Sequence, residues 1–158
     1  NEFLDYLKLK KYGLIIKTHP NDSSSFKHLE CDYVKNIDAK TLKKHNINFY
    51  EVLGWSDVLI TDYSSVYYDY LLVDKPIIFF NYDYDNYIQN RSLMIENYEF
   101  WTPGIKARTT KELISGIHES ITNDPFQHRR VIIKDEIHRY QDNKSTNRLI
   151  KFINSIVN

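Results

Sequence analysis

Three short apolar segments, each bounded by polar residues, constrain the fold of this chain more than any other feature. They are "GLIIKTH" (Gly13–His19), "DVLITD" (Asp57–Asp62) and "KPIIFFNY" (Lys75–Tyr82). Continuous apolar runs of this length suit strands of a parallel sheet covered on both faces better than strands of a half-exposed antiparallel sheet. A weaker fourth candidate is "CDYVKNI" (Cys31–Ile37).

Patterns with the period of a helix alternate with these runs. One of them opens with a Thr-x-x-Glu capping box, Thr109 to Glu112. The helical segments are "NFYEVLGWS", "SSVYYDYLLVD", "TTKELISGIHESITND", "FQHRRVIIKDEIHRY" and "TNRLIKFINSIV". This alternation predicts an α/β domain with a doubly wound parallel sheet, Rossmann-like in the broad sense. The chain has four glycines and no G-x-G-x-x-G turn, so it lacks a typical NAD site.

Composition narrows the possible functions. A length of 158 residues predicts one domain over residues 1–158, and a formal charge of zero gives no field that would recruit nucleic acid. The single Cys31 excludes an internal disulfide framework, and the six histidines lack ligand spacing, so no metal site is expected. No apolar run approaches the roughly 20 residues that span a bilayer, and no signal peptide is recognisable, so a cytoplasmic location is expected.

The segment Thr61-Asp62-Tyr63-Ser64-Ser65 interrupts the most hydrophobic region of the chain with polar groups. It ends a predicted strand and starts a predicted helix. Ligands of open α/β sheets bind at the carboxyl ends of the strands, and a helix N-terminus favours phosphate. The alternative is that Asp62 and Ser64 only cap the helix. One capping residue would be enough, so the segment carries more polar groups than capping requires.

A second polar segment, "KTHP" (Lys17 to Pro20), follows the first predicted strand. If both strands are parallel, His19 would lie on the same rim as Ser64 and Ser65. A histidine there could hold or protonate a phosphate oxygen, because its pKa lies near physiological pH. The alternative is a structural histidine in a turn fixed by Pro20.

These segments together resemble a known family. "KTHP", "SDVLITDYSSVYYDYLLVDKPIIFFNYD" (Ser56–Asp83) and "PGIKARTTKELISGI" are similar to the C-terminal half of the CDP-glycerol glycerophosphotransferases, the teichoic-acid polymerases and primases also found among capsule polymerases. With its weaker flanks the resemblance covers nearly the whole chain. It implies the C-terminal half of a GT-B fold, in which two Rossmann-like domains face each other across a cleft and this half holds the CDP-alcohol donor.

The resemblance also implies roles for residues. The family's Thr-Asp-Tyr-Ser-Ser segment contacts the diphosphate, which maps to Thr61, Ser64 and Ser65, with Asp62 between them. The histidine of its His-Pro motif, implicated in catalysis, maps to His19, and Lys17 lies beside it.

Two further regions of the chain match the family less closely. Arg91 occupies the place of a family Arg-Gly-Phe sequence, although Ser92 and Leu93 replace the Gly-Phe here. Near the end, His138 and Asp142 match a family histidine and an Asp-Gly-x-Ala-Ser segment, but Asn143 replaces the glycine.

The implied reaction transfers glycerol phosphate, or a related polyol phosphate, from a CDP-alcohol to a hydroxyl of a teichoic-acid-like or capsular polymer or primer, releasing CMP. No cofactor or metal is implied. The acceptor-binding domain would lie outside this chain, so residues 1–158 are expected to be a donor-binding fragment that is inactive alone. Full-length members of the family lie peripherally on the inner face of the bacterial cell membrane, and basic surface from Lys8 to Lys11 could contact lipid.

Two alternatives stay open from the sequence. One is a GT-B nucleotide-sugar glycosyltransferase or epimerase domain, in which Asp69 would be the carboxylate that holds the sugar hydroxyls. The other is a non-catalytic module that uses a degenerate nucleotide pocket for docking, with the tyrosine-rich segment from Asn81 to Trp101 as its surface.

Overall fold

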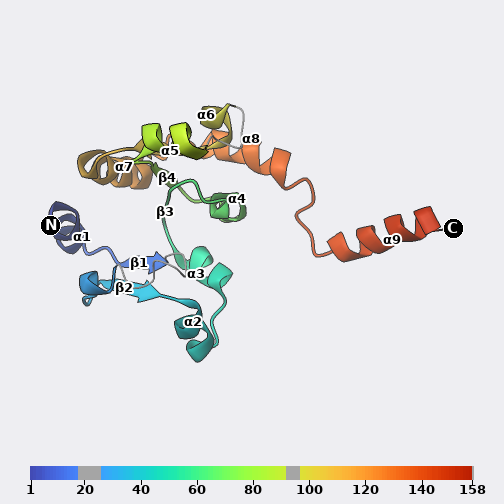
Figure 1. The fold of residues 1–158 in the computed structure, drawn as a ribbon, viewed down its shortest axis with the longest axis horizontal. Coiled ribbons are helices and arrows are strands. Elements are labelled where there is room, and N and C mark those ends of the chain that lie inside the picture. The colour runs from blue at the N-terminus through green and yellow to red at the C-terminus, as the bar shows by residue number, and fades with distance from the viewer. Residues whose placement is uncertain (18–25, 92–96, 158) are drawn as a thin grey trace.

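Helices and strands alternate along the chain, as the sequence predicts (Figure 1). The computed structural model describes residues 1–17, 26–91 and 97–157. The strands are β1 (Leu14–Lys17), β2 (Val34–Ile37), β3 (Leu59–Thr61), β4 (Ile77–Phe80) and β5 (Ile105–Ala107). The α-helices are α1 (Glu2–Lys10), α2 (Ala39–His45), α3 (Phe49–Trp55), α4 (Val66–Tyr70), α5 (Tyr84–Arg91), α6 (Tyr98–Trp101), α7 (Thr110–Thr122), α8 (Gln127–Ile137) and α9 (Ser145–Val157). The 3₁₀ helices are η2 (Lys27–Leu29) and η3 (Leu71–Val73).

Every strand pair formed by the described residues is parallel, which confirms the predicted pairing. Hydrogen bonds join the strands in two sets, β1 with β2, and β3-β4-β5 in that order. The register places Thr61 opposite Phe79 and Phe80 opposite Ala107. Consequently the carboxyl ends of β3, β4 and β5 meet at one edge.

Strand β4 is covered on both faces, which explains its unbroken apolar sequence. Ile77 and Phe79 belong to one core cluster, with residues of α4, η3 and α8, whereas Ile78 belongs to a second cluster with residues of α7. Side chains of a strand alternate between the two faces of its sheet. The two clusters therefore lie on opposite faces of the sheet, each beneath one of the two layers of helices that are expected around a buried parallel sheet.

An ion pair fastens α8 to the body. The guanidinium of Arg130 is 1% exposed, and its two terminal nitrogens each donate to a carboxylate oxygen of Asp124 at 2.6 Å. Its Nε lies 3.7 Å from the carboxylate of Asp74, the residue that follows η3. Arg130 thus links α8 to the end of the α4–η3 segment.

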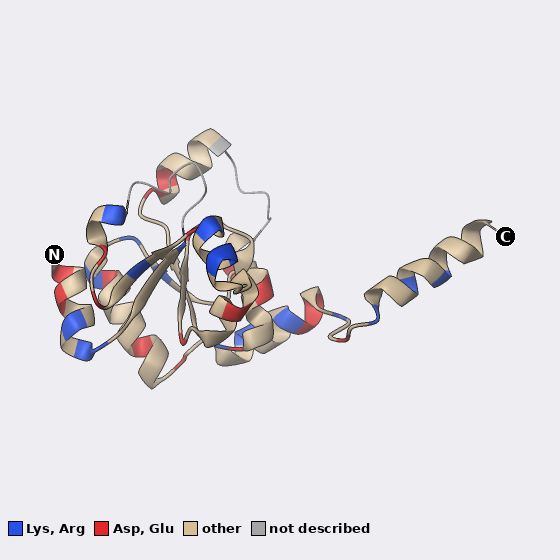
Figure 2. Ribbon diagram, turned by 90° about the horizontal axis from the view of Figure 1, so that it is seen from below, with Lys and Arg blue, Asp and Glu red and all other residues tan. Residues whose placement is uncertain are grey.

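Helix α9 projects from the body in both views of the fold (Figures 1 and 2). None of its residues is buried. Its apolar side chains follow helical spacing, so they share one face, and α9 carries basic residues but no Asp or Glu. The exposed large apolar residues are Leu149, Ile150, Phe152, Ile153, Ile156 and Val157. No helix of the described ranges is long and apolar enough to cross a bilayer.

Candidate functional site

The polar segment Thr61–Ser65 lies where the sequence predicts it, between a strand and a helix. Thr61 is the last residue of β3 and is 9% exposed, and Ser65 is the N-cap residue of α4. The strand's carboxyl end and the first backbone N–H groups of the helix therefore come together here, which is the arrangement that suits an anion. Helix α4 has only five residues, so its dipole is short.

Hydrogen bonds within this segment support part of the capping alternative. Asp62 accepts a hydrogen bond from the Ser64 N–H at 3.0 Å, and the Ser64 hydroxyl accepts one from the Val66 N–H at 3.4 Å. The side chain of Ser65 makes no capping bond, although this residue occupies the N-cap position, and it is exposed. Capping thus accounts for Asp62 and Ser64 but not for the hydroxyl of Ser65.

Tyr63 joins this segment to the next loop of the sheet edge. Its hydroxyl donates to Asp83 Oδ1 at 3.1 Å, and its ring stacks on Tyr87 of α5, with centroids 3.6 Å apart and an interplanar angle of 12°. Burial, followed by the hydrogen bond to Asp83, raises the pKa of the Tyr63 phenol, which therefore keeps its proton. The β3–α4 and β4–α5 loops are consequently held side by side.

A buried polar pair lies behind this contact. Asn81, the residue after β4, is 2% exposed, and its Oδ1 accepts a hydrogen bond from the Tyr98 hydroxyl at 3.1 Å. Burial raises the pKa of Tyr98 to about 12. The Nδ2 of Asn81 and the hydroxyl of Tyr67 are buried without a partner among the described residues. Buried polar atoms are normally paired, so these two are exceptions to the usual pattern.

The remaining residues predicted for the donor site lie at several places. Lys17 ends β1, and its ammonium lies 5.5 Å from the ring centre of Phe49, the first residue of α3. Asp69 is exposed on α4, and Arg91 is the last residue of α5. His19 lies outside the described residues.

The structure separates the two residues predicted near the end of the chain. His138, at the C-cap of α8, is half-buried, and its Nε2 lies 2.7 Å from the Tyr68 carbonyl oxygen of α4. A carbonyl can only accept, so Nε2 carries the proton. Asp142 instead lies before α9, where it accepts a hydrogen bond from the Lys144 N–H and pairs with Arg148 at 2.9 Å, and these contacts, in that order, lower its pKa. His138 therefore contacts the helix of the polar segment, while Asp142 contacts α9.

Asn81, Asp83 and Tyr98 lie at this sheet edge but were not predicted for the donor site, since the sequence placed them only in the tyrosine-rich segment of the docking alternative. The available signal was the polar pair in "NYD", directly after the third predicted strand, at the same kind of strand end as Thr61 and Asp62. The contribution of Tyr98 had no local signal, because it reaches Asn81 from a position 17 residues later.

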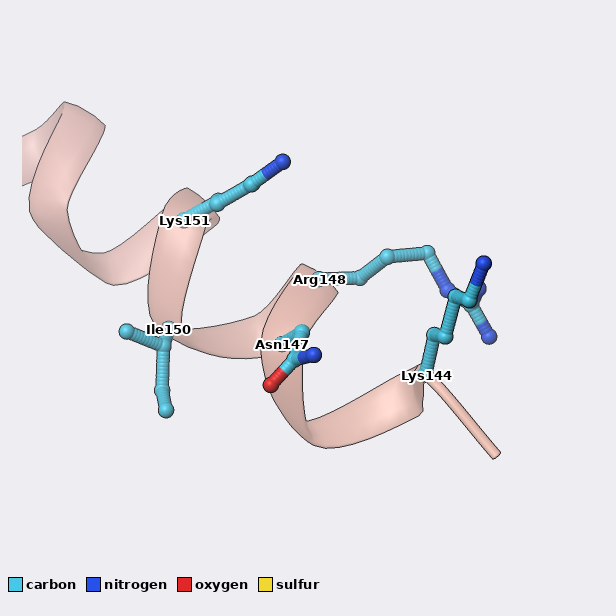
Figure 3. Close-up of a pocket in the computed structure, with 5 residues that line it drawn as sticks. All are labelled: Lys144, Asn147, Arg148, Ile150 and Lys151. Atoms are coloured by element: carbon cyan, nitrogen blue, oxygen red, sulfur yellow. The ribbon is translucent and has the colours of Figure 1, made fainter. Parts of the chain in front are cut away.

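A surface hollow lies elsewhere, along the first turns of α9 (Figure 3). Its lining residues are Lys144, Asn147, Arg148, Ile150 and Lys151. They come from one exposed helix and its preceding residue, away from the sheet edge. Within the described ranges, no group of three or more His, Cys, Asp or Glu side chains could hold a metal ion.

Comparison with known proteins agrees with the fold and with the sequence motifs. The chain is 30% identical to the teichoic acid glycerol-phosphate primase of Bacillus subtilis (strain 168) over 151 residues, 94% of this chain and 36% of that protein. It is 38% identical over 130 residues to the teichoic acid poly(ribitol-phosphate) polymerase of Bacillus spizizenii, 78% of this chain and 20% of that protein. The chain thus spans about a third or less of the length of these relatives.

The structure of the wall teichoic acid polymerase TagF superimposes on 99% of this chain and 37% of its own, with a TM-score of 0.68 and 24% identity. A TagF variant with CDPG covers 97% of this chain and 38% of its own, with a TM-score of 0.64 and 25% identity. The likeness to TagF confirms the predicted α/β class. It also confirms that this chain forms part of a GT-B fold. Residues 1–155 match the family described as CDP-Glycerol:Poly(glycerophosphate) glycerophosphotransferase, and the chain belongs to that family.

Proposed function

We propose that residues 1–158 are the donor-binding domain of a transferase that moves glycerol phosphate or a related polyol phosphate from a CDP-alcohol to a teichoic-acid-like or capsular polymer. The observation that carries this proposal is the position of Ser64 and Ser65 at the carboxyl end of β3 and the start of α4, in a chain of this family. Hydroxyls at the start of a helix suit the diphosphate of the donor, because they can donate hydrogen bonds to its oxygens.

The proposed reaction is a phosphoryl transfer. A hydroxyl oxygen of the acceptor forms a bond to the alcohol-bearing phosphorus, the bond from that phosphorus to the oxygen of CMP breaks, and the acceptor's proton passes to a base. Such reactions depend on positioning and on stabilising the oxygens that gain charge. Thr61, Ser64 and Ser65 would bind the donor phosphates, and His19 would stabilise or protonate the departing CMP phosphate. No step calls for a cofactor.

We further propose that this domain works as one half of a longer, two-domain enzyme. The relatives are about three times as long or longer. The apolar face of α9 has no partner in the described part of the chain, and apolar surface of this extent is normally covered. A second domain that supplies the acceptor site would cover it and close the cleft. Residues 1–158 alone should therefore bind donor without turnover.

Peripheral contact with the inner face of the bacterial cell membrane is a separate part of the proposal. Lys8, Lys10 and Lys11 are exposed around Leu9, which is 78% exposed. Basic residues near anionic lipid contribute about 1 kcal/mol each. The chain should sediment with vesicles of anionic lipid but not with vesicles of neutral lipid. The variant in which Lys8, Lys10 and Lys11 are all replaced by alanine should no longer sediment with the anionic vesicles.

Isothermal titration tests the donor site. The 158-residue chain is titrated with CDP-glycerol, CDP-ribitol, CMP and UDP-glucose, and the titrations are repeated with Ser64→Ala/Ser65→Ala. Ser155→Ala, which removes an exposed hydroxyl on α9, is the matched control. We expect the CDP-alcohols to bind better than UDP-glucose, and the double variant alone to lose binding while keeping its circular dichroism. Equal binding by the double variant would mean that the serines only begin a helix.

A further inference from the structure

A second polar group lies at the same edge of the sheet as the serines of the proposed donor site. Asp83 follows β4, and its Oδ1 accepts the hydrogen bond of Tyr63, the neighbour of Ser64. Because β3 and β4 are adjacent and parallel, the two loops leave the sheet at the same edge. A ligand that bound its phosphates at Ser64 and Ser65 would therefore lie at the same edge of the sheet as Asp83.

The charge of Asp83 indicates which part of a ligand it would bind. No Lys or Arg of the described ranges forms an ion pair with Asp83, and Arg108, at the neighbouring strand end, pairs with Asp85 at 3.9 Å instead. An unpaired carboxylate repels phosphate but is a strong acceptor for hydroxyl groups. Asp83 therefore suits a neutral part of the ligand that carries hydroxyls.

The surroundings of Asp83 hold it in place. Tyr63 is fixed by stacking on Tyr87 and by its bond to the carboxylate. Asn81, two residues before Asp83, is tied to Tyr98. Rigid side chains are what a small polar ligand needs for orientation.

We propose that Asp83, oriented by Tyr63, binds the hydroxyl groups of the polyol part of the donor and so helps to determine which CDP-alcohol is used. The inference rests on the proposed function. Asp83 would accept hydrogen bonds from the alcohol through the oxygen that Tyr63 leaves free. Tyr63 is a positioning residue, since it acts through Asp83.

The test compares ligands with and without the alcohol. Isothermal titration of the 158-residue chain gives the ratio of the Kd of CDP to the Kd of CDP-glycerol, and the corresponding ratio for CDP-ribitol. The variants are Asp83→Asn and Tyr63→Phe, with Asp85→Asn as the control, because Asp85 is an exposed carboxylate two residues further along, in the first turn of α5. Circular dichroism and the thermal midpoint verify that each variant is folded.

Asp83→Asn should weaken the binding of CDP-glycerol by about tenfold or more, as expected for the loss of a hydrogen bond to a charged group, and should leave CDP unchanged or slightly tighter. Tyr63→Phe should weaken the binding of CDP-glycerol by a smaller factor, and Asp85→Asn should leave the binding of CDP-glycerol unchanged. If the unaltered chain binds CDP and both CDP-alcohols equally, or if Asp83→Asn weakens all three alike, the polyol site is wrong while the donor site stands. If CDP does not bind at all, the proposed function fails for this chain and the polyol site fails with it.

Discussion

Replacing Arg130 with methionine is expected to lower the free energy of unfolding by about 3 kcal/mol, the lower end of the range for breaking a buried ion pair. Methionine fills much of the space of the arginine stem but leaves Asp124 charged and without its two hydrogen bonds of 2.6 Å. The side chain of Asp124 is 27% exposed, so water can solvate part of the orphaned carboxylate. This partial hydration places the cost at the lower end.

The two carboxylates near Arg130 should contribute unequally. Asp74 is 37% exposed and lies 3.7 Å from Nε, beyond hydrogen-bonding distance, so Asp74→Asn should cost less than about 1 kcal/mol. Asp124→Asn removes the charge from the bidentate pair and should cost about 3 kcal/mol or more. Both positions have positive φ, 54° and 42°, which asparagine tolerates. Backbone strain therefore does not confound the comparison.

Urea unfolding followed by circular dichroism measures these differences, provided that the slopes of the transitions are equal. The reasoning would be refuted if Arg130→Met changed the unfolding free energy by less than about 0.5 kcal/mol, the usual effect of a surface substitution. It would also be refuted if Asp74→Asn cost as much as Asp124→Asn, because the bidentate geometry would then have no special role.

Three further predictions concern stability. Gly104→Ala should cost about 1–3 kcal/mol, since a Cβ would collide with the Ile77 carbonyl oxygen, whereas Gly13→Ala, with no atom within 4 Å, should cost nothing in the same urea assay. Burial lowers the pKa of Lys106 to about 8 from its ordinary value of 10.5, so between these values the unfolded chain binds a proton that the folded chain does not. Stability should therefore rise with pH from about 8 to 10, and Lys106→Met should remove this rise in urea midpoints measured across that range. Thr109→Ala removes the N-cap of α7 and should lower the unfolding free energy by about 1 kcal/mol, and an unchanged thermal midpoint would contradict the capping role.

Burial on both faces made β4 predictable from the sequence. Ile77–Phe80 reads as an unbroken apolar run because its side chains enter two cores. The apolar run also located β1, but the prediction that this strand is buried was wrong, since its side chains alternate between half-buried and exposed and Ile15 is 49% exposed. The capping box of α7 was equally predictable, because both of its hydrogen bonds lie within four residues of each other. Features with a local cause were therefore found.

Features held by distant contacts were not found. Helix α5 is rich in Asn, Asp and Tyr, which have weak helix preference, and it contacts the body through the stacking of Tyr87 on Tyr63. Strand β5 is three residues long and contains Lys106, so its sequence has no recognisable strand pattern. It is a strand because it pairs with β4. The predicted helix after Ser65 was right in position, but it changes to a 3₁₀ helix at Leu71.

The same distinction applies to the candidate site. Asp62 and Ser64 bond to backbone groups two residues away, so a helix start is enough to explain them. Ser65 makes no capping bond, and the Tyr63–Asp83 contact joins two loops across 20 residues of sequence, so neither is required to begin α4. Asp83 directly precedes α5, where an aspartate is favoured at a helix start, but that position does not require its bond to Tyr63. A CDP-alcohol, which carries adjoining phosphate and hydroxyl groups, would use both the hydroxyl of Ser65 and the carboxylate of Asp83.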